Sequence, residues 1–173
     1  MVFQWIPDFP RIPVHSLSNP PPPGFGPFAI LTQERDDEEA LLSLVQQHGS
    51  NLVLPEVWSR LFPQTGVLIS SAISGGVLKQ RFQDAVQKYP NRCWLLPDPI
   101  SMAFPLPCPD GSGYEIAVQN YINQFFSEDL GCMYTHQIRD NRGFMILWDT
   151  VETMLQKQDW AKQAGFLGTA DLS

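Results

Sequence analysis

Short apolar runs alternate with amphipathic segments between residue 28 and residue 96 of the chain. Each run is four or five residues long and rich in aliphatic side chains, a pattern that predicts buried strands. The predicted strands cover residues 28–32, 51–54, 66–70 and 92–96. Because segments with helical spacing separate them, we predict an α/β fold with a mainly parallel sheet or a partial, shortened barrel.

The helical segments carry recognisable boundary residues. Asp36 or Asp37 can cap a helix that Gly49 then ends. A proline suits the start of a short turn over residues 56–62. Residues 77–89 place their apolar side chains on one helical face, which predicts a second long helix.

The pattern changes after residue 96. Residues 97–113 hold five prolines, which predicts irregular structure. The turn sequence Arg-Asp-Asn-Arg-Gly lies between two apolar runs, so we predict an antiparallel hairpin near residues 133–148. The remaining predicted elements are a helix, two strands, a helix and a last strand, over residues 115–126, 133–138, 144–148, 151–164 and 166–172.

The first 27 residues differ in composition from the rest, with seven of the chain's sixteen prolines lying before Gly24. Such a segment favours polyproline II and opposes both a helix and a central strand. Because it is also rich in apolar residues, we expect it to pack on the body; the alternative is a ligand for a proline-binding module. The predicted organisation is an arm over residues 1–27 and a single α/β domain over residues 28–173.

Charge narrows the range of partners. The chain has 173 residues, 18 of them acidic and 11 basic, a net charge of −7 and a pI near 4.8. Binding to nucleic acid or to an anionic membrane needs clustered Lys and Arg, so we expect neither partner. No stretch approaches the roughly 20 apolar residues of a membrane span, and the N-terminus lacks a signal-peptide pattern. Three cysteines do not make a disulfide framework, so we expect a cytoplasmic protein.

Polar residues at the ends of predicted strands are the candidate catalytic residues. In parallel α/β folds, sites form where strands end and helices begin. This rule selects Glu34, Ser70, Ser71 and Asp98, and also Asp149 if its strand is parallel to the others. Each could instead cap a helix, because Ser and Asp are common capping residues.

Candidate ligand-binding residues come from one loop and from aromatic side chains. Ser74, Gly75 and Gly76 can present backbone N–H groups to an anion, but the loop matches no phosphate-binding motif, and Ser74 could simply cap a helix. Aromatic side chains could stack on sugar rings if they are exposed, and would fill a core if they are buried. The aromatic candidates are Trp94, Phe104 and Trp148.

Cys132 and His136 are four residues apart, which raises the question of a metal site. On one strand, residues at this spacing lie ~13 Å apart, too far to bind the same ion. We therefore predict neither a metal site nor a cofactor.

Two segments of the second half match a known family in residue type and order. Residues 92–113 are predicted to form a strand that enters a loop with an aromatic residue and a Leu-Pro pair. Their sequence is Arg-Cys-Trp-Leu-Leu-Pro-Asp-Pro-Ile-Ser-Met-Ala-Phe-Pro-Leu-Pro-Cys-Pro-Asp-Gly-Ser-Gly. Residues 134–168 add a turn with Asp140 and Gly143, a strand that ends in Trp148-Asp149, and a helix with Lys157 followed by Ala-Gly-Phe-Leu-Gly. Together they resemble the closing part of family-18 glycoside hydrolases of the spore-cortex type.

The resemblance implies a shortened, non-hydrolytic relative of these enzymes. The family's catalytic signature, Asp-x-x-Asp-x-Glu, occurs nowhere in the chain, and Thr169-Ala170-Asp171-Leu172 stands where the last strand would carry a tryptophan. The chain is also shorter than the ~250 residues of a full eight-stranded barrel. No catalytic role can therefore be transferred to a particular residue.

Three functional hypotheses follow. The preferred one is a non-catalytic binding or assembly protein, distantly related to glycoside hydrolases, with a carbohydrate or protein partner. The alternative is a small cytoplasmic enzyme, a hydrolase or transferase, which needs at least two of the strand-end residues in one pocket to act on a small metabolite. The third is a homo-oligomer in which the N-terminal arm packs on a neighbouring subunit.

Overall fold

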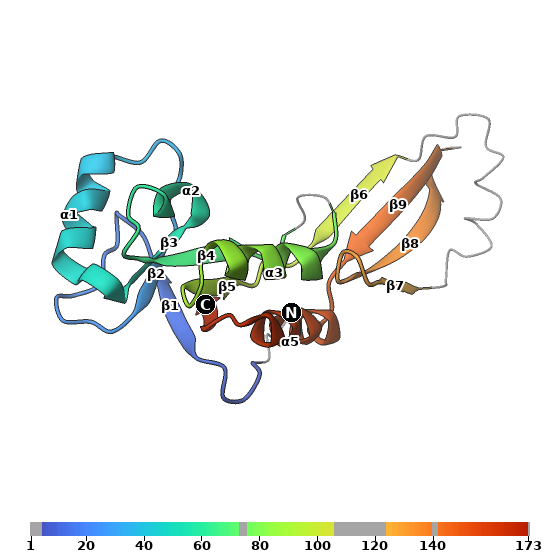
Figure 1. Ribbon diagram of the computed structural model, residues 1–173. Helices are drawn as coiled ribbons and strands as arrows, with labels where there is room; N and C mark the ends of the chain where they lie inside the picture. Colours follow the sequence, from blue (N-terminus) through green and yellow to red (C-terminus); the bar gives the residue numbers. More distant parts are fainter. Residues whose placement is uncertain (1–4, 73–75, 106–123, 140–141, 173) are drawn as a thin grey trace.

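Six parallel strands close into a small barrel in the computed structural model, which describes residues 5–72, 76–105, 124–139 and 142–172 (Figure 1). Around the barrel the order is β1-β10-β5-β4-β3-β2, and every neighbouring pair is parallel. The predicted α/β class with a shortened barrel is thus confirmed. The strands are β1 (Arg11–His15), β2 (Phe28–Ile30), β3 (Leu52–Pro55), β4 (Gly66–Ser70), β5 (Cys93–Leu96) and β10 (Gly168–Asp171).

Alternation along the strands fills the barrel interior with side chains. Successive residues of a strand point to opposite faces, so one set from each strand points inward. The inward set forms one apolar cluster: Ile12, Ala29, Val53, Leu68 and Ala170, with Val14, Trp94 and Leu96 packed against it. The barrel is therefore a packed core, not a channel.

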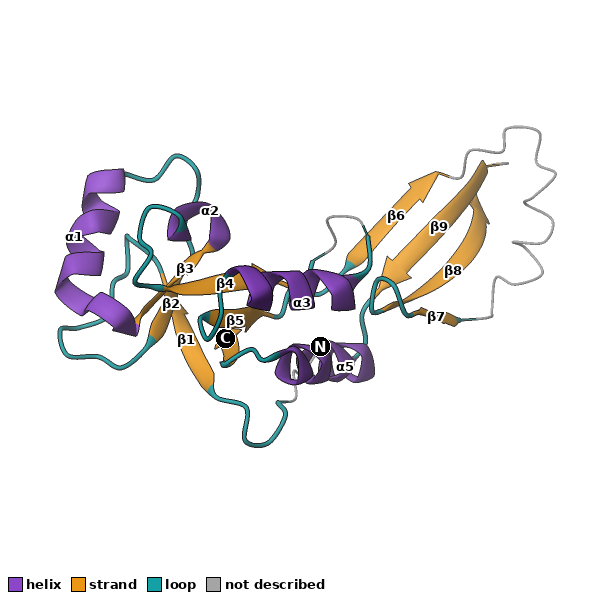
Figure 2. Cartoon of the chain, viewed as in Figure 1, coloured by secondary structure: helices purple, strands orange, loops and turns teal. Residues whose placement is uncertain are grey.

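Four described helices pack around this barrel (Figure 2). One apolar cluster joins β2 and β3 to the first two helices, and a second cluster joins β4 and β5 to the other two. None of these helices is long and apolar enough to cross a membrane. They are α1 (Glu38–His48), continued by a 3₁₀ turn at Gly49–Asn51, α2 (Glu56–Ser59), α3 (Leu78–Lys88) and α5 (Val151–Ala164).

A separate antiparallel sheet leaves the barrel between β5 and α5 and extends to one side of it (Figure 1). Its strand order is β6-β9-β8-β7. The predicted hairpin is confirmed, because β8 and β9 pair from Met133 opposite Trp148 to Arg139 opposite Arg142. The four strands are β6 (Ser101–Pro105), β7 (Phe125–Ser127), β8 (Cys132–Arg139) and β9 (Arg142–Trp148).

Three strands were not predicted. β1 lies in the proline-rich segment, where we expected no central strand; Pro13 is tolerated because the ladder to β10 ends there and the ladder to β2 begins at Val14. β6 lies in the stretch predicted to be irregular. Phe125 and Phe126 belong to β7 and not to the predicted helix over 115–126, because they pair with Tyr134 and Met133. The part of that helix up to residue 123 lies outside the described residues.

Candidate functional site

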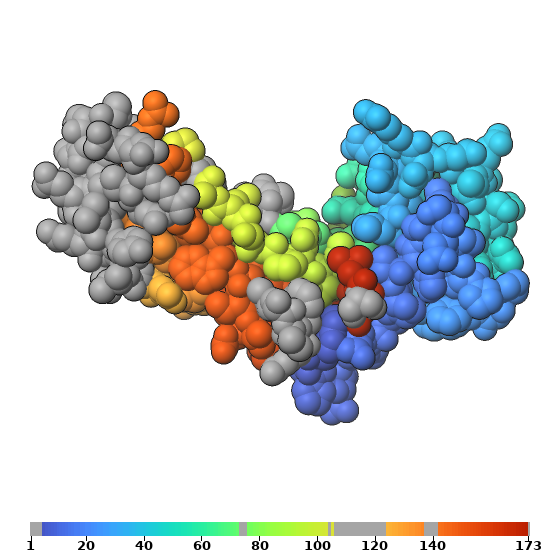
Figure 3. Space-filling view, turned by 180° about the vertical axis from the view of Figure 1, so that it is seen from behind, coloured from blue at the N-terminus to red at the C-terminus, as the bar shows by residue number. Residues whose placement is uncertain are grey.

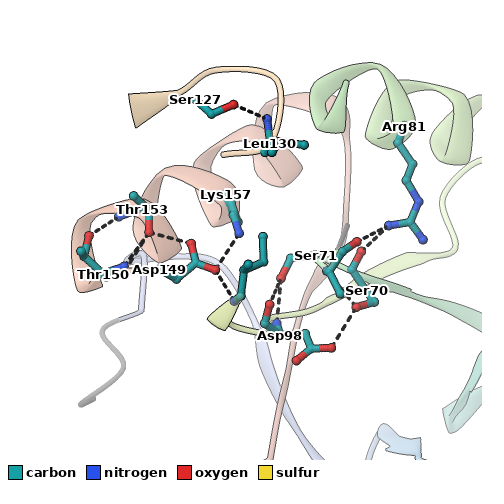
Figure 4. A network of polar contacts seen from close by, with 12 residues as sticks. Ser70, Ser71, Arg81, Asp98, Ser127, Leu130, Asp149, Thr150, Thr153 and Lys157 are labelled. Carbon is teal, nitrogen blue, oxygen red and sulfur yellow. Dashed lines mark hydrogen bonds and ion pairs between the residues drawn. The ribbon is translucent and has the colours of Figure 1, made fainter. Parts of the chain in front are cut away.

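Three of the predicted strand-end residues meet at the carboxyl ends of β4 and β5 (Figure 4). Ser71 is fully buried and joins the two strand ends, because its Oγ accepts from the Asp98 N–H at 2.7 Å and donates to the Asp98 carbonyl at 3.1 Å. Ser70 is half-buried and points its Oγ toward the exposed Asp98 carboxylate, 3.5 Å from Oδ2. We call Ser70, Ser71 and Asp98 the mouth cluster.

Arg81 of α3 binds backbone carbonyls at the mouth cluster. Its Nη1 donates to the Ser70 carbonyl at 2.7 Å and to the Ala72 carbonyl at 3.1 Å. The Ser70 hydroxyl in turn accepts from the Ala72 N–H at 3.0 Å. The guanidinium therefore fixes the backbone beneath Ser70, and the Ser70 and Asp98 side chains keep their hydrogen-bonding capacity on the solvent side.

The mouth cluster places a serine hydroxyl beside a carboxylate. The Ser70 Oγ lies 3.5 Å from the Asp98 Oδ2, beyond the roughly 2.6–3.2 Å of a formed nucleophile–base hydrogen bond. Among the described residues, the hydrogen bonds of the cluster involve no histidine. An exposed carboxylate beside a hydroxyl can instead accept and donate hydrogen bonds to a ligand that carries several hydroxyl groups.

Asp149 does not join this cluster. Its side chain is fully buried and forms an ion pair with Lys157, whose Nζ lies 2.8 Å from Oδ2. The same carboxylate accepts from the Ile100 N–H at 2.6 Å and from the Thr153 hydroxyl at 2.7 Å (Figure 4). Its strand, β9, belongs to the antiparallel sheet, so the condition under which we selected Asp149 is not met. With every contact directed inward, Asp149 joins β6, β9 and α5 and faces no solvent.

A buried thiol lies against the Asp149 network. Cys132 is fully buried at the start of β8. Burial raises the pKa of its thiol above the usual range; the Lys157 charge opposes this rise and the Asp149 charge adds to it. Among the described residues, no group of three or more His, Cys, Asp or Glu side chains could hold a metal ion.

The predicted ligand-binding residues fall in different environments. Trp94 is half-buried and packs in the barrel interior, where a Cβ on Gly168 would come within 2.7 Å of its ring and one on Gly66 within 3.2 Å. Trp148 is half-buried at the end of β9, and Gly76 is exposed with a φ of 78°. Ser74, Gly75 and the Phe104 side chain lie outside what the structure describes.

The sequence analysis did not predict two contacts. One is the pair of hydrogen bonds from Arg81 to backbone carbonyls at the mouth cluster, and the other is the ion pair between Lys157 and Asp149. Asp149, Thr153 and Lys157 are four residues apart, a spacing that places Thr153 and Lys157 on one helical face. This spacing could have indicated that Lys157 neutralises Asp149. Arg81 had no comparable signal, because its partners are backbone carbonyls of another element.

Comparison with known proteins defines the class of fold. Three solved structures, all from Bacillus, are similar to the chain at 9–12% identity. The spore cortex-lytic enzyme SleL of Bacillus megaterium has a TM-score of 0.51, with 83% of this chain and 44% of that chain covered. SleL of Bacillus cereus has a TM-score of 0.52, with coverages of 76% and 40%. The Bacillus subtilis protein YdhD, named for a sporulation-specific glycosylase, has a TM-score of 0.55, with coverages of 85% and 65%.

These structures show a glycoside hydrolase-like fold and nothing finer. The chain spans less than two thirds of the length of each of them. No model of a known protein family matches the chain, and no curated protein matches it either. The fold resemblance expected from residues 92–168 is confirmed.

Proposed function

We propose that this protein binds a glycan at the mouth of its barrel without hydrolysing it. The observation that carries the proposal is the Ser70–Asp98 pair, a hydroxyl beside an exposed carboxylate, at the carboxyl ends of parallel strands in a glycoside hydrolase-like fold. Ligands of such barrels bind at this end of the strands. A sugar presents neighbouring hydroxyl groups, to which a carboxylate and a serine hydroxyl are complementary.

Among its described residues the mouth cluster holds one carboxylate, which suits binding without cleavage. Glycoside hydrolysis uses two carboxyl groups on either side of the scissile bond, about 5–9.5 Å apart. The mouth cluster supplies Asp98 alone, and Asp149 is enclosed in its ion pair with Lys157. The Asp-x-x-Asp-x-Glu signature is also missing from the whole sequence.

The surface is hollowed beside the segment that carries Asp98. In the view from behind, the surface is hollowed between the barrel and the antiparallel sheet (Figure 3). The yellow-green atoms between the two come from the segment that follows β5 and from β6. The mouth cluster contributes Asp98 from this same segment.

Titration calorimetry with a defined panel of glycans tests the proposal. The probes are a tetramer of N-acetylglucosamine, cellotetraose and soluble fragments of spore cortex. We expect binding of at least one probe, and a loss of about tenfold or more in Asp98→Asn, because one charge-assisted hydrogen bond contributes about 1.5–3 kcal/mol. Asp84→Asn is the matched control, since Asp84 is an exposed carboxylate on α3 whose partner is Gln80.

A reducing-end assay on the same probes separates binding from hydrolysis. We expect no new reducing ends from the native protein over many hours. Reducing ends that disappear in Asp98→Asn would favour the enzyme hypothesis and end the non-catalytic one. If no probe binds, or if Asp98→Asn and Asp84→Asn bind as the native protein does, glycan binding at the mouth is wrong.

A further inference from the structure

A cavity of about 580 Å³ lies on one face of the antiparallel sheet. Residues of the turn between β7 and β8 line one side of it, and side chains of β8 and β9 line the other. No residue of the mouth cluster contributes to it. We call it the sheet pocket.

The strand register makes the inner wall of the sheet pocket aromatic and aliphatic. Tyr134 pairs with Leu147 and His136 pairs with Met145, so these four side chains share one face of the sheet. Phe125 lies opposite Tyr134, and the two ring centroids are 5.5 Å apart. The wall therefore offers π-faces and apolar contacts, together with the Tyr134 hydroxyl and the His136 ring nitrogens.

The rim of the sheet pocket is acidic. Glu128 and Asp129 line it, and within the described part of the chain neither carboxylate forms an ion pair. No Lys or Arg is among the described residues that line the pocket. Both carboxylates are exposed to solvent.

Contacts to two helices hold this rim in place. The Ser127 Oγ accepts from the Leu130 N–H at 3.2 Å, and the Asp129 carbonyl accepts from the Leu78 N–H of α3 at 2.7 Å. Gly131 ends the turn with a φ of 70°, and a Cβ there would lie 2.9 Å from Trp160 and 3.0 Å from Lys157 of α5. The carboxylates are thus presented by a backbone that needs little ordering on binding, which favours affinity.

The charges beside the sheet pocket favour a cationic ligand. Glu128 and Asp129 line it, and Arg142 lies at the far end of the β8–β9 hairpin. Anionic ligands such as phosphates are repelled, whereas a cation is attracted and can also contact the aromatic faces.

We propose that the sheet pocket binds a lysine or arginine side chain of a partner protein. The aliphatic stem of such a side chain packs against Met145, Leu147 and Tyr134, and its cationic end reaches Glu128 and Asp129 at the rim. A neutral ligand gains less here, because the carboxylates of Glu128 and Asp129 attract a positive charge. The inference is independent of glycan binding at the barrel mouth, since the two sites share no residue.

Amide chemical-shift mapping of the native chain provides the test. The probe is the blocked peptide Gly-Lys-Gly-Lys-Gly, and the control probe is the same peptide with both lysines acetylated. We expect shifts at Glu128, Asp129, Tyr134 and Met145 with the first peptide, weaker binding at high salt, and at least tenfold weaker binding of the acetylated peptide. The exposed acidic run at the start of α1, with Glu38 and Glu39, serves as an internal reference for attraction by charge alone.

Matched variants decide the outcome. Glu128→Gln/Asp129→Asn should reduce binding about tenfold or more, while Glu38→Gln/Glu39→Gln should leave it unchanged. Both pairs are exposed, so an unchanged amide spectrum will show that each variant remains folded. Shifts confined to the α1 run, equal binding of the acetylated peptide, or tighter binding of free glucosamine would each overturn the assignment to a basic side chain.

Discussion

Asp98 and Asp149 were selected by the same sequence rule and have opposite environments in the structure. Asp149 is fully buried and has three partners within 2.8 Å, among them the Lys157 ammonium. Asp98 is exposed, and among the described residues the contact of its carboxylate is to the Ser70 hydroxyl at 3.5 Å. The difference teaches that position at a strand end does not separate a carboxylate held in the core from one that faces solvent. What separates them is whether the protein itself already satisfies the charge.

The two regions also differ in what they connect. The Asp149 network joins β6, β9 and α5, the point at which the antiparallel sheet meets the helix that returns to the barrel. The mouth cluster joins only the ends of β4 and β5 and leaves its solvent side open. We therefore expect changes in the first region to alter stability and changes in the second to alter ligand binding.

The largest expected effect is that of Lys157→Met. This substitution leaves the Asp149 carboxylate buried without its counter-charge, which costs roughly 3–5 kcal/mol in known cases. We expect the free energy of unfolding, measured by urea denaturation, to fall by about that amount. Asp149→Asn/Lys157→Met removes both charges and should be less destabilised than Lys157→Met. A loss below about 1 kcal/mol in Lys157→Met would place the pair among weak surface ion pairs and contradict its buried role.

A second buried ionisable group predicts how stability depends on pH. Burial raises the pKa of the Cys93 thiol from 9.0 to about 11, and the nearby Arg92 opposes that rise. The folded state therefore favours the neutral thiol. Its contribution is complete below pH 9 and is lost as the pH rises through 11, by about 2–3 kcal/mol. Urea unfolding at pH 8 and pH 11 should show this extra loss in the native protein and not in Cys93→Ala. Equal losses in the two proteins would contradict it.

Within the mouth cluster, Ser71 is expected to contribute to stability, as the Asp149 network does. Ser71→Ala leaves the Asp98 N–H without its acceptor at 2.7 Å, in a position that is fully buried. We expect the free energy of unfolding to fall by about 1–2 kcal/mol. Ser70→Ala is the matched control; its hydroxyl is half-buried, so the loss should be smaller. If the two variants are equally stable, Ser71 does not secure the strand ends.

The sequence predicted the elements whose apolar residues recur at the spacing of a strand or a helix. Strand residues 66–70 and helix residues 151–164 were placed correctly, because apolar periodicity and a terminal Gly165 define them. β1 was not predicted, because a proline usually interrupts a strand. Pro13 is tolerated there because the N–H that it lacks would lie where the ladder to β10 ends and the ladder to β2 begins. β7 was missed because Phe125 and Phe126 suit both a helix and a strand, and only pairing with β8 decides between them.

The candidate site, like the fold, was predicted in part from the sequence. Ser70, Ser71 and Asp98 were found because parallel strands bring their ends together wherever the strand order makes them neighbours. The sequence did not predict which carboxylate is buried, since that depends on the antiparallel sheet packing over α5. It also did not predict the sheet pocket, whose wall arises from the register of β8 against β9.

The smallest expected effect on stability is that of Asp98→Asn. The Asp98 carboxylate is exposed, and its contact with the Ser70 hydroxyl is weak at 3.5 Å. Removing the negative charge should therefore change the free energy of unfolding by less than about 0.5 kcal/mol. The same substitution is expected to abolish most of the glycan affinity, because a ligand hydroxyl loses its charged acceptor. Urea unfolding and calorimetry on one protein preparation compare the two effects. A destabilisation as large as that of Lys157→Met would show that Asp98 is structural like Asp149, and the contrast between the two carboxylates would disappear.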